Sequence, residues 1–189
     1  MTRQPGLAAY DLRSNFPPLV WEAVERTRRD HFPLACTPEV GHLLRLLAGG
    51  ASRICELGTG YGVGAAWMAS GMRRDATLLT VEIDPHRADS ARELFANAPV
   101  IAVETGDWSV ALGRGTFDLL FSDGGPKRAP GDPEKLLPLL SQGGLVVLDD
   151  YTPGGGEDVS RKIWLENSAY RAVEVTLTAE MAVILATKR

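Results

Sequence analysis

Four glycines alternate with other residues in the short stretch from position 58 to position 64, directly after a run of apolar residues. The full stretch reads Glu56-Leu57-Gly58-Thr59-Gly60-Tyr61-Gly62-Val63-Gly64. Glycines at a strand-to-helix turn let the backbone approach a ligand closely, and the following helix offers unpaired N–H groups. The stretch therefore predicts a cofactor site, the alternative being a glycine-rich turn that binds nothing.

Two cofactors compete for this turn. The residues from Gly60 onward fit the GxGxxA form of the dinucleotide fingerprint, and Glu82 follows 22 residues after Gly60, which suits an acid on a ribose hydroxyl pair. An acid at Glu56, however, would face the anionic pyrophosphate of a nicotinamide cofactor. S-adenosylmethionine carries an ammonium and a sulfonium instead, so Glu56 favours S-adenosylmethionine.

Alternating apolar strands and amphipathic helices must position these residues. The last two β-prone runs are separated by three residues, too few for a crossover helix, so they form an antiparallel hairpin. The pattern predicts an α/β, Rossmann-like fold: a seven-stranded, mostly parallel sheet with a C-terminal antiparallel hairpin and helices on both faces. We predict strands at 53–57, 77–82, 100–105, 117–122, 144–149, 170–177 and 181–187, and helices at 19–29, 38–47, 62–72, 86–96, 133–140 and 158–167.

Composition is that of a single soluble domain. The chain has 189 residues, 44% of them hydrophobic and 23% charged, with a formal net charge of −4. The charge predicts neither nucleic acid nor a membrane surface as partner, and no stretch reaches the roughly 18 apolar residues of a membrane span. We expect a cytoplasmic protein with one domain over 1–189, in which N-terminal helices (1–50) contribute to an acceptor pocket and 51–189 form the cofactor-binding core.

Over residues 35–189 the sequence resembles the class I S-adenosylmethionine-dependent methyltransferases, through ICELGTGYGVGAAWMA and LLTVEIDP. It is similar in finer detail to the O-methyltransferase family that includes the catechol and caffeoyl-CoA enzymes. The three motifs that carry this likeness are TPEVGHLL, FDLLFSDGG and GGLVVLDDYTPGG. The resemblance implies methyl transfer to a hydroxyl of a small phenolic or catechol-like molecule, by a chain that forms a homodimer. Val20, Trp21 and Val24, which we expect to be exposed, agree with a dimer.

The resemblance also implies which residues hold the cofactor. Glu56 and Gly58 lie near its methionine end, Glu82 on the ribose hydroxyls and Ile83 against adenine. Trp108 stacks on adenine or belongs to the core. The complete set of expected cofactor-binding residues is Thr37, Glu56, Gly58, Gly60, Tyr61, Glu82, Ile83, Asp107, Trp108 and Asp123.

In metal-dependent members of the family, carboxylates from two later strand ends bind Mg²⁺, and here these are Asp123, Asp149 and Asp150. Hard oxygen ligands suit Mg²⁺, and three clustered carboxylates without a cation would repel one another. The alternative is a solvated acidic rim. The family has Asn where Asp150 stands.

Asp123, Lys127 and His31 are the candidate catalytic residues. The family's lysine stands closer behind the first aspartate than Lys127 does behind Asp123, so Lys127 is either a base or a solvated charge. His31 is the candidate base of a metal-free mechanism. Residues 124–133, rich in Gly and Pro, are expected to form a mobile loop over the site.

Other functions stay open at this point. The acceptor could be an amine, a protein or a tRNA, although no (N/D)PPY segment for exocyclic amino groups is present. A nicotinamide-dependent oxidoreductase would need a proton relay such as Tyr-x-x-x-Lys, which is missing. A non-catalytic S-adenosylmethionine-binding protein is a further alternative. Cys55, inside an apolar run, is expected to be a small buried hydrophobe, whereas Cys36, just before a predicted helix, is a candidate reactive thiol.

Overall fold

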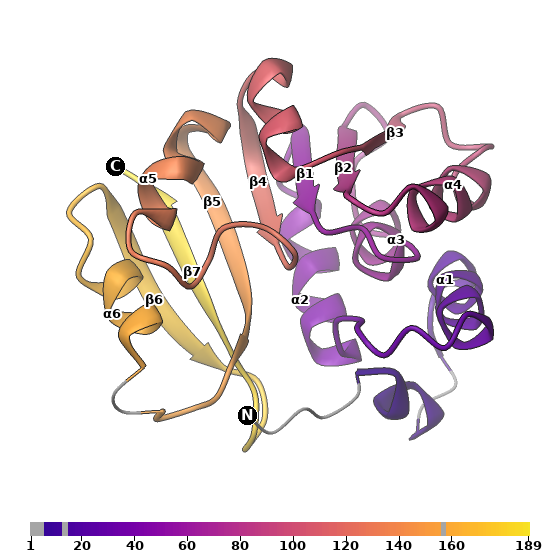
Figure 1. The fold of residues 1–189 in the computed structure, drawn as a ribbon, viewed down its shortest axis with the longest axis horizontal. Coiled ribbons are helices and arrows are strands. Elements are labelled where there is room, and N and C mark those ends of the chain that lie inside the picture. The colour runs from indigo at the N-terminus through magenta and orange to yellow at the C-terminus, as the bar shows by residue number, and fades with distance from the viewer. Residues whose placement is uncertain (1–5, 13–14, 156–157) are drawn as a thin grey trace.

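The computed structural model describes residues 6–12, 15–155 and 158–189, and these form a three-layer α/β structure around one sheet (Figure 1). The sheet order is β3-β2-β1-β4-β5-β7-β6. The strands are β1 (Arg53–Leu57), β2 (Thr77–Glu82), β3 (Ile101–Thr105), β4 (Phe117–Ser122), β5 (Leu140–Tyr151), β6 (Tyr170–Thr176) and β7 (Ala182–Lys188).

Strands β1 to β5 pair in parallel, whereas β7 runs antiparallel to both β5 and β6. The predicted fold class is thereby confirmed, including the C-terminal hairpin. Strand β5 was predicted to begin at position 144, but it begins at Leu140. Leu140 pairs with Phe117 ahead of a register shift between β4 and β5, which extends the strand.

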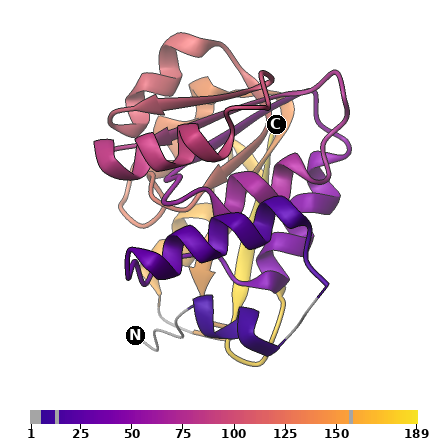
Figure 2. The same cartoon turned by 90° about the vertical axis from the view of Figure 1, so that its right-hand side faces the viewer.

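Six α-helices and three short 3₁₀-helices cover the two faces of the sheet in the described residues (Figures 1 and 2). One apolar cluster packs η1 and α1 to α4 against one face, and a second packs η2, η3, α5 and α6 against the other. The helices are α1 (Pro18–Arg29), α2 (Pro38–Ala48), α3 (Val63–Ala69), α4 (Pro85–Leu94), α5 (Asp132–Leu136) and α6 (Val159–Leu165), with η1 (Gly6–Leu12), η2 (Trp108–Arg114) and η3 (Leu137–Leu139).

The N-terminal helices belong to the core. Val20 and Val24 are fully buried and Trp21 is half-buried, so the expectation that these side chains are exposed is wrong. Their apolar faces pack on the chain's own α3, and the Trp67 indole there donates to the Tyr10 hydroxyl at 2.8 Å. These residues therefore give no support to a dimer.

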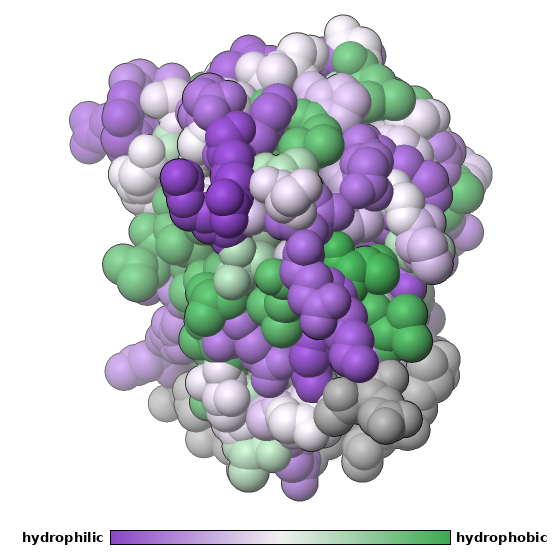
Figure 3. Space-filling view, turned by 90° about the vertical axis from the view of Figure 1, so that its left-hand side faces the viewer, coloured by the Kyte–Doolittle hydropathy of each residue, from purple (hydrophilic) through white to green (hydrophobic). Residues whose placement is uncertain are grey.

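Strand β6, at one edge of the sheet, and the neighbouring α6 expose apolar side chains. Val173 on β6, with Val159 and Leu165 on α6, is exposed, and hydrophobic side chains gather across the middle of this face (Figure 3). No helix among the described residues is long and apolar enough to cross a membrane.

Candidate active site

A cavity of about 260 Å³ opens at the carboxyl ends of β1, β2 and β4, beside the glycine-rich turn that joins β1 to α3. Gly58, Gly60 and Gly62 all have positive φ, at 101°, 54° and 94°. A Cβ on Gly58 would also lie 2.4 Å from the backbone nitrogen of Gly124. The turn after β1 thus packs directly on the turn after β4, a contact that a larger residue at position 58 would break.

Glu56 lies at the floor of this cavity. Its side chain is 1% exposed, and the Thr80 hydroxyl donates to its Oε2 at 2.5 Å. Burial raises the pKa of Glu56 well above its ordinary value, and the charges of Asp123 and Glu82 add to that shift. A positive group bound in the cavity would offset this cost, because it favours the ionised carboxylate.

Glu82, at the end of β2, is held from two sides. Its Oε2 accepts from the Gly60 N–H at 2.7 Å, while its Oε1 accepts from the Asp84 N–H at 3.0 Å. Arg87 donates to Oε1 through Nε at 3.1 Å and Nη2 at 2.8 Å, and its guanidinium lies 4.8 Å from the ring centroid of Phe32. The acid expected to hold a ribose therefore has a fixed orientation at the cavity wall.

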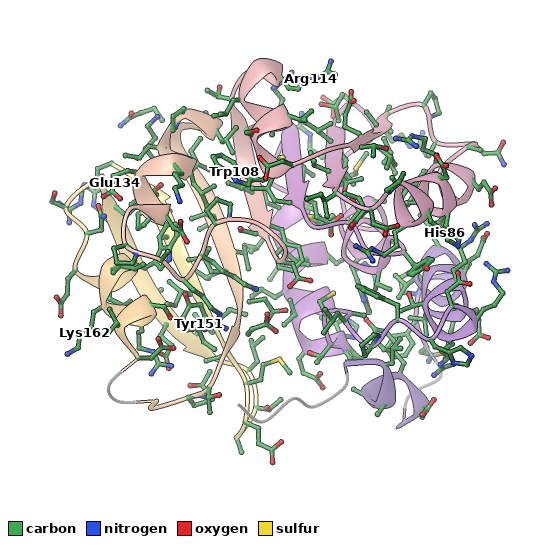
Figure 4. All side chains as sticks on the ribbon, viewed as in Figure 1. His86, Trp108, Arg114, Glu134, Tyr151 and Lys162 are labelled. Carbon is green, nitrogen blue, oxygen red and sulfur yellow. The ribbon has the colours of Figure 1, made fainter. Side chains whose placement is uncertain are left out.

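The adenine side of the predicted site is also present. Ile83 is 69% exposed and lines the cavity together with Asp107 and Trp108. Asp107 is the N-cap of η2, and Trp108, labelled in Figure 4, is its first residue. Asp107 caps this helix by accepting from the Ser109 N–H at 3.0 Å. Of the expected cofactor-binding residues, the cavity brings together Glu56, Gly58, Gly60, Tyr61, Glu82, Ile83, Asp107, Trp108 and Asp123.

Thr37 is the exception, because it lines a second cavity instead. It stands at the N-cap position of α2, yet its hydroxyl makes no capping bond and donates to the Met181 sulfur at 3.1 Å. The second cavity has a volume of about 710 Å³ and shares four lining residues with the first: Leu34, Ala35, Cys36 and Asp123. The two cavities therefore meet beside Asp123.

Asp123, Asp149 and Asp150 come together as predicted, each with one oxygen within 4.8 Å of the others. All three line the second cavity. Burial, with the charges of Asp123 and Asp150, raises the pKa of Asp149 to about 7. Loss of hydration, with the charge of Asp150, also raises the pKa of Asp123, although Lys127 opposes it.

Lys127 is buried, with 8% of its surface exposed, so the interpretation as a solvated charge is wrong. Its Nζ lies 2.7 Å from Asp150 Oδ2 and 3.5 Å from Asp123 Oδ1. Burial disfavours the ammonium, but the two aspartates outweigh burial and hold the pKa of Lys127 above its ordinary value. Residues 124–131 form a loop, whereas 132 and 133, predicted to belong to it, begin α5. Hydrogen bonds from Tyr151 and Trp164 to the Lys127 carbonyl hold this loop.

His31 and Cys36 are not part of the acidic cluster. His31 is exposed, with φ at 52°, and lines neither cavity. Cys36 lines both cavities but is 4% exposed, and burial next to Asp149 and Asp123 raises the pKa of its thiol. Burial and the neighbouring carboxylates therefore disfavour the thiolate that a reactive Cys36 would need.

Several residues that line the two cavities were not predicted from the sequence. Phe32 and Arg87 line the smaller cavity. The positive charge of Arg87, five residues after Glu82, is the sequence signal that could have indicated a partner for this acid. The second cavity is lined in part by Tyr151 at the end of β5 (Figure 4), Arg161 of α6 and Met181 of the β6–β7 turn. These residues come together only through the sheet order.

The sheet order, the glycine turn and the acids at the ends of β1 and β2 define the Rossmann-like fold of class I methyltransferases. Residues 55–151 match the family model described as a methyltransferase domain. An O-methyltransferase relative from Mycobacterium marinum is 32% identical over 161 residues, covering 80% of this chain and 68% of its own length. The chain belongs to the class I S-adenosylmethionine-dependent O-methyltransferase family.

Other comparisons agree. An O-methyltransferase relative from Mycobacterium tuberculosis is 36% identical over 130 residues, covering 64% of this chain, and the chain spans 58% of that relative's length. The crystal structure of an O-methyltransferase from Bacillus cereus, in complex with SAH, superposes with a TM-score of 0.76 at 21% identity and covers 96% of both chains. The fold is thus shared along nearly the whole chain.

Proposed function

We propose that this chain transfers the methyl group of S-adenosylmethionine to a hydroxyl of a small phenolic or catechol-like molecule. The observation that carries the proposal is the junction of the two cavities. Asp123 and residues 34–36 line both, so a methyl group held in the smaller cavity faces an acceptor held in the larger one. Such positioning supplies much of the rate of a displacement reaction.

The charge of the smaller cavity supports this cofactor. Four acids line it, Glu56, Glu82, Asp107 and Asp123, and Arg87 is the one Lys or Arg among its described lining residues. The Arg87 guanidinium is already paired with Glu82. An excess of negative charge suits an ammonium and a sulfonium and opposes a pyrophosphate, so it disfavours a nicotinamide cofactor.

We propose in addition that Asp123, Asp149 and Asp150 hold a Mg²⁺ ion. The donor set fits: three carboxylates supply hard oxygens within 4.8 Å of one another, and the pKa of Asp149 stays raised although the nearby Lys127 opposes the shift. A bound Mg²⁺ would lower the pKa of an acceptor hydroxyl and orient its oxygen. Asp123 lines both cavities, and we propose it as the catalytic residue. Lys127 pairs with Asp123 but is not among the residues that line either cavity, so we propose it as a residue that positions Asp123.

Calorimetric titration with S-adenosylmethionine and with NADH tests the cofactor. Glu56→Gln keeps the size of the side chain and should weaken S-adenosylmethionine binding by about tenfold or more, since it removes a buried charge that faces the ligand. Glu104→Gln is the matched control, because Glu104 on β3 pairs with Arg114 outside the cavity. Binding of NADH but not of S-adenosylmethionine would refute the assignment.

Methyl transfer to a panel of catechols, with anilines and amines beside them, tests the acceptor. Methylation on oxygen is expected, and methylation on nitrogen alone would replace the hydroxyl acceptor with an amine. The same panel with EDTA tests the metal. Activity that is indifferent both to EDTA and to Asp149→Ala would remove Mg²⁺ from the mechanism.

A further inference from the structure

The acidic cluster already contains a cation of the chain's own. The Lys127 ammonium lies 2.7 Å from Asp150 Oδ2 and 3.5 Å from Asp123 Oδ1, which are two of the three side chains proposed to hold Mg²⁺. The lysine is buried, whereas a lysine without a partner is almost never buried. Its ammonium therefore neutralises part of the cluster by direct pairing.

The position of this lysine is fixed by its backbone. The Lys127 carbonyl accepts from the Tyr151 hydroxyl at 3.1 Å and from the Trp164 indole N–H at 2.9 Å, and both aromatic side chains are buried. Two hydrogen bonds on one carbonyl hold the residue at the cluster, although it lies in a loop rich in Gly and Pro. These bonds hold the backbone of Lys127, from which the side chain extends to the cluster.

We propose that the Lys127 ammonium and a divalent cation compete for the same carboxylates. This inference rests on the proposed metal site. A doubly charged ion bound to Asp123 and Asp150 would stand within a few ångströms of the ammonium, and like charges at such distances repel strongly inside a protein. Metal binding therefore requires the lysine side chain to leave the cluster, and the lysine lowers the affinity for the metal. Without metal, Lys127 keeps the three carboxylates together.

Titration of Mg²⁺ into the wild-type chain and into Lys127→Met, followed by calorimetry, tests the competition. Methionine keeps the length and removes the charge, so the variant should bind Mg²⁺ at least about tenfold more tightly. Lys135→Met is the matched control: Lys135 Nζ lies 2.8 Å from Asp132 Oδ1, and that pair stands apart from the cluster. The control should bind Mg²⁺ like the wild-type chain.

A second measurement uses thermal unfolding of the same proteins in EDTA and in Mg²⁺. A ligand that binds the folded state stabilises it by an amount that grows with the logarithm of one plus the ratio of ligand concentration to Kd. At one Mg²⁺ concentration, the tighter-binding Lys127→Met should therefore gain more in Tm than the wild-type chain. A Lys127→Met chain that folds only with Mg²⁺ present would also support the proposal. Lys127→Gln, with the same expected gain in affinity, replaces the methionine variant if that one folds under neither condition.

Equal or weaker Mg²⁺ binding by the neutral variant would overturn the competition. If neither the wild-type chain nor the variant binds Mg²⁺, both the competition and the metal site are refuted. Titration of S-adenosylmethionine into the same samples then distinguishes the proposed metal site from the proposed methyltransferase function. If the cofactor binds although Mg²⁺ does not, the methyltransferase proposal stands without the metal.

Discussion

The buried carboxyl of Asp149 should make the metal-free protein lose stability as the pH rises. Asp149 is 4% exposed, and its pKa is raised from 3.8 to about 7. Between these two values the folded state holds a proton that the unfolded chain releases. Stability therefore falls with rising pH over this range, and above it the full cost of burying the charge is present.

The magnitude follows from the gap between the two values. Each pH unit is worth about 1.4 kcal/mol, so the gap of about three units corresponds to a cost of roughly 4 kcal/mol. About half of this cost, near 2 kcal/mol, develops between about pH 5.5 and about pH 8. Asp149→Asn removes the charge and retains an oxygen that can accept from the Asp150 N–H, now 2.7 Å from Asp149 Oδ1.

Urea unfolding of both proteins in EDTA at these two pH values measures the effect. We expect the stability of Asp149→Asn relative to wild type to improve by about 2 kcal/mol on going to the higher pH. Asp118→Asn is the control. Although burial opposes it, hydrogen bonds from the Arg53 N–H, the Ser141 hydroxyl and the Ser52 N–H hold the pKa of Asp118 below its ordinary value.

The Asp118 carboxylate is ionised in both states over this pH range, and its contribution is lost only as the pH falls through its lowered pKa. Asp118→Asn should therefore cost the same stability at both pH values. If the relative stability of Asp149→Asn is also the same at both, the buried charge of Asp149 is compensated in solution and our reasoning about the cluster fails.

Two further substitutions test the cofactor cavity. A Cβ on Gly64 would lie 2.2 Å from Glu56 Oε1, so Gly64→Ala should displace the carboxylate and weaken S-adenosylmethionine binding by about tenfold or more, as measured by calorimetry. Gly113→Ala, where a Cβ meets nothing within 4 Å, should leave binding unchanged. Arg87→Met removes the two guanidinium donors to Glu82 Oε1 and should weaken cofactor binding by roughly threefold to tenfold in the same titration. An unchanged affinity would contradict this role of Arg87.

The sheet was predictable because its central parallel strands β1, β2 and β4 are buried on both faces and read as short apolar runs that end in polar residues. Strands β1, β2 and β4 have the predicted bounds. Most helices differ by a few residues at their ends, where local signals are weak. The cofactor side of the site was predictable for the same reason, since Glu56 and Glu82 are fixed by the strand ends that carry them.

The acceptor side was not predictable, because its walls depend on contacts distant in sequence. Lys127 reaches the cluster because Tyr151 and Trp164, 24 and 37 residues further on, bind its carbonyl. Spacing relative to Asp123 carries no trace of those bonds. Likewise, the hydrogen bond from Thr37 to Met181 joins residues 144 positions apart, so no local pattern revealed which cavity Thr37 lines.

The segment between α1 and α2 connects the two halves of the site. Phe32 faces the cofactor cavity and stacks on Arg87, which orients Glu82. Thr37, at the other end of the segment, is tied to Met181 beside the acceptor cavity. Residues 34–36 between them line both cavities. One short segment therefore contributes to the walls of both cavities, so the N-terminal part of the chain shapes the cofactor site as well as the proposed acceptor site.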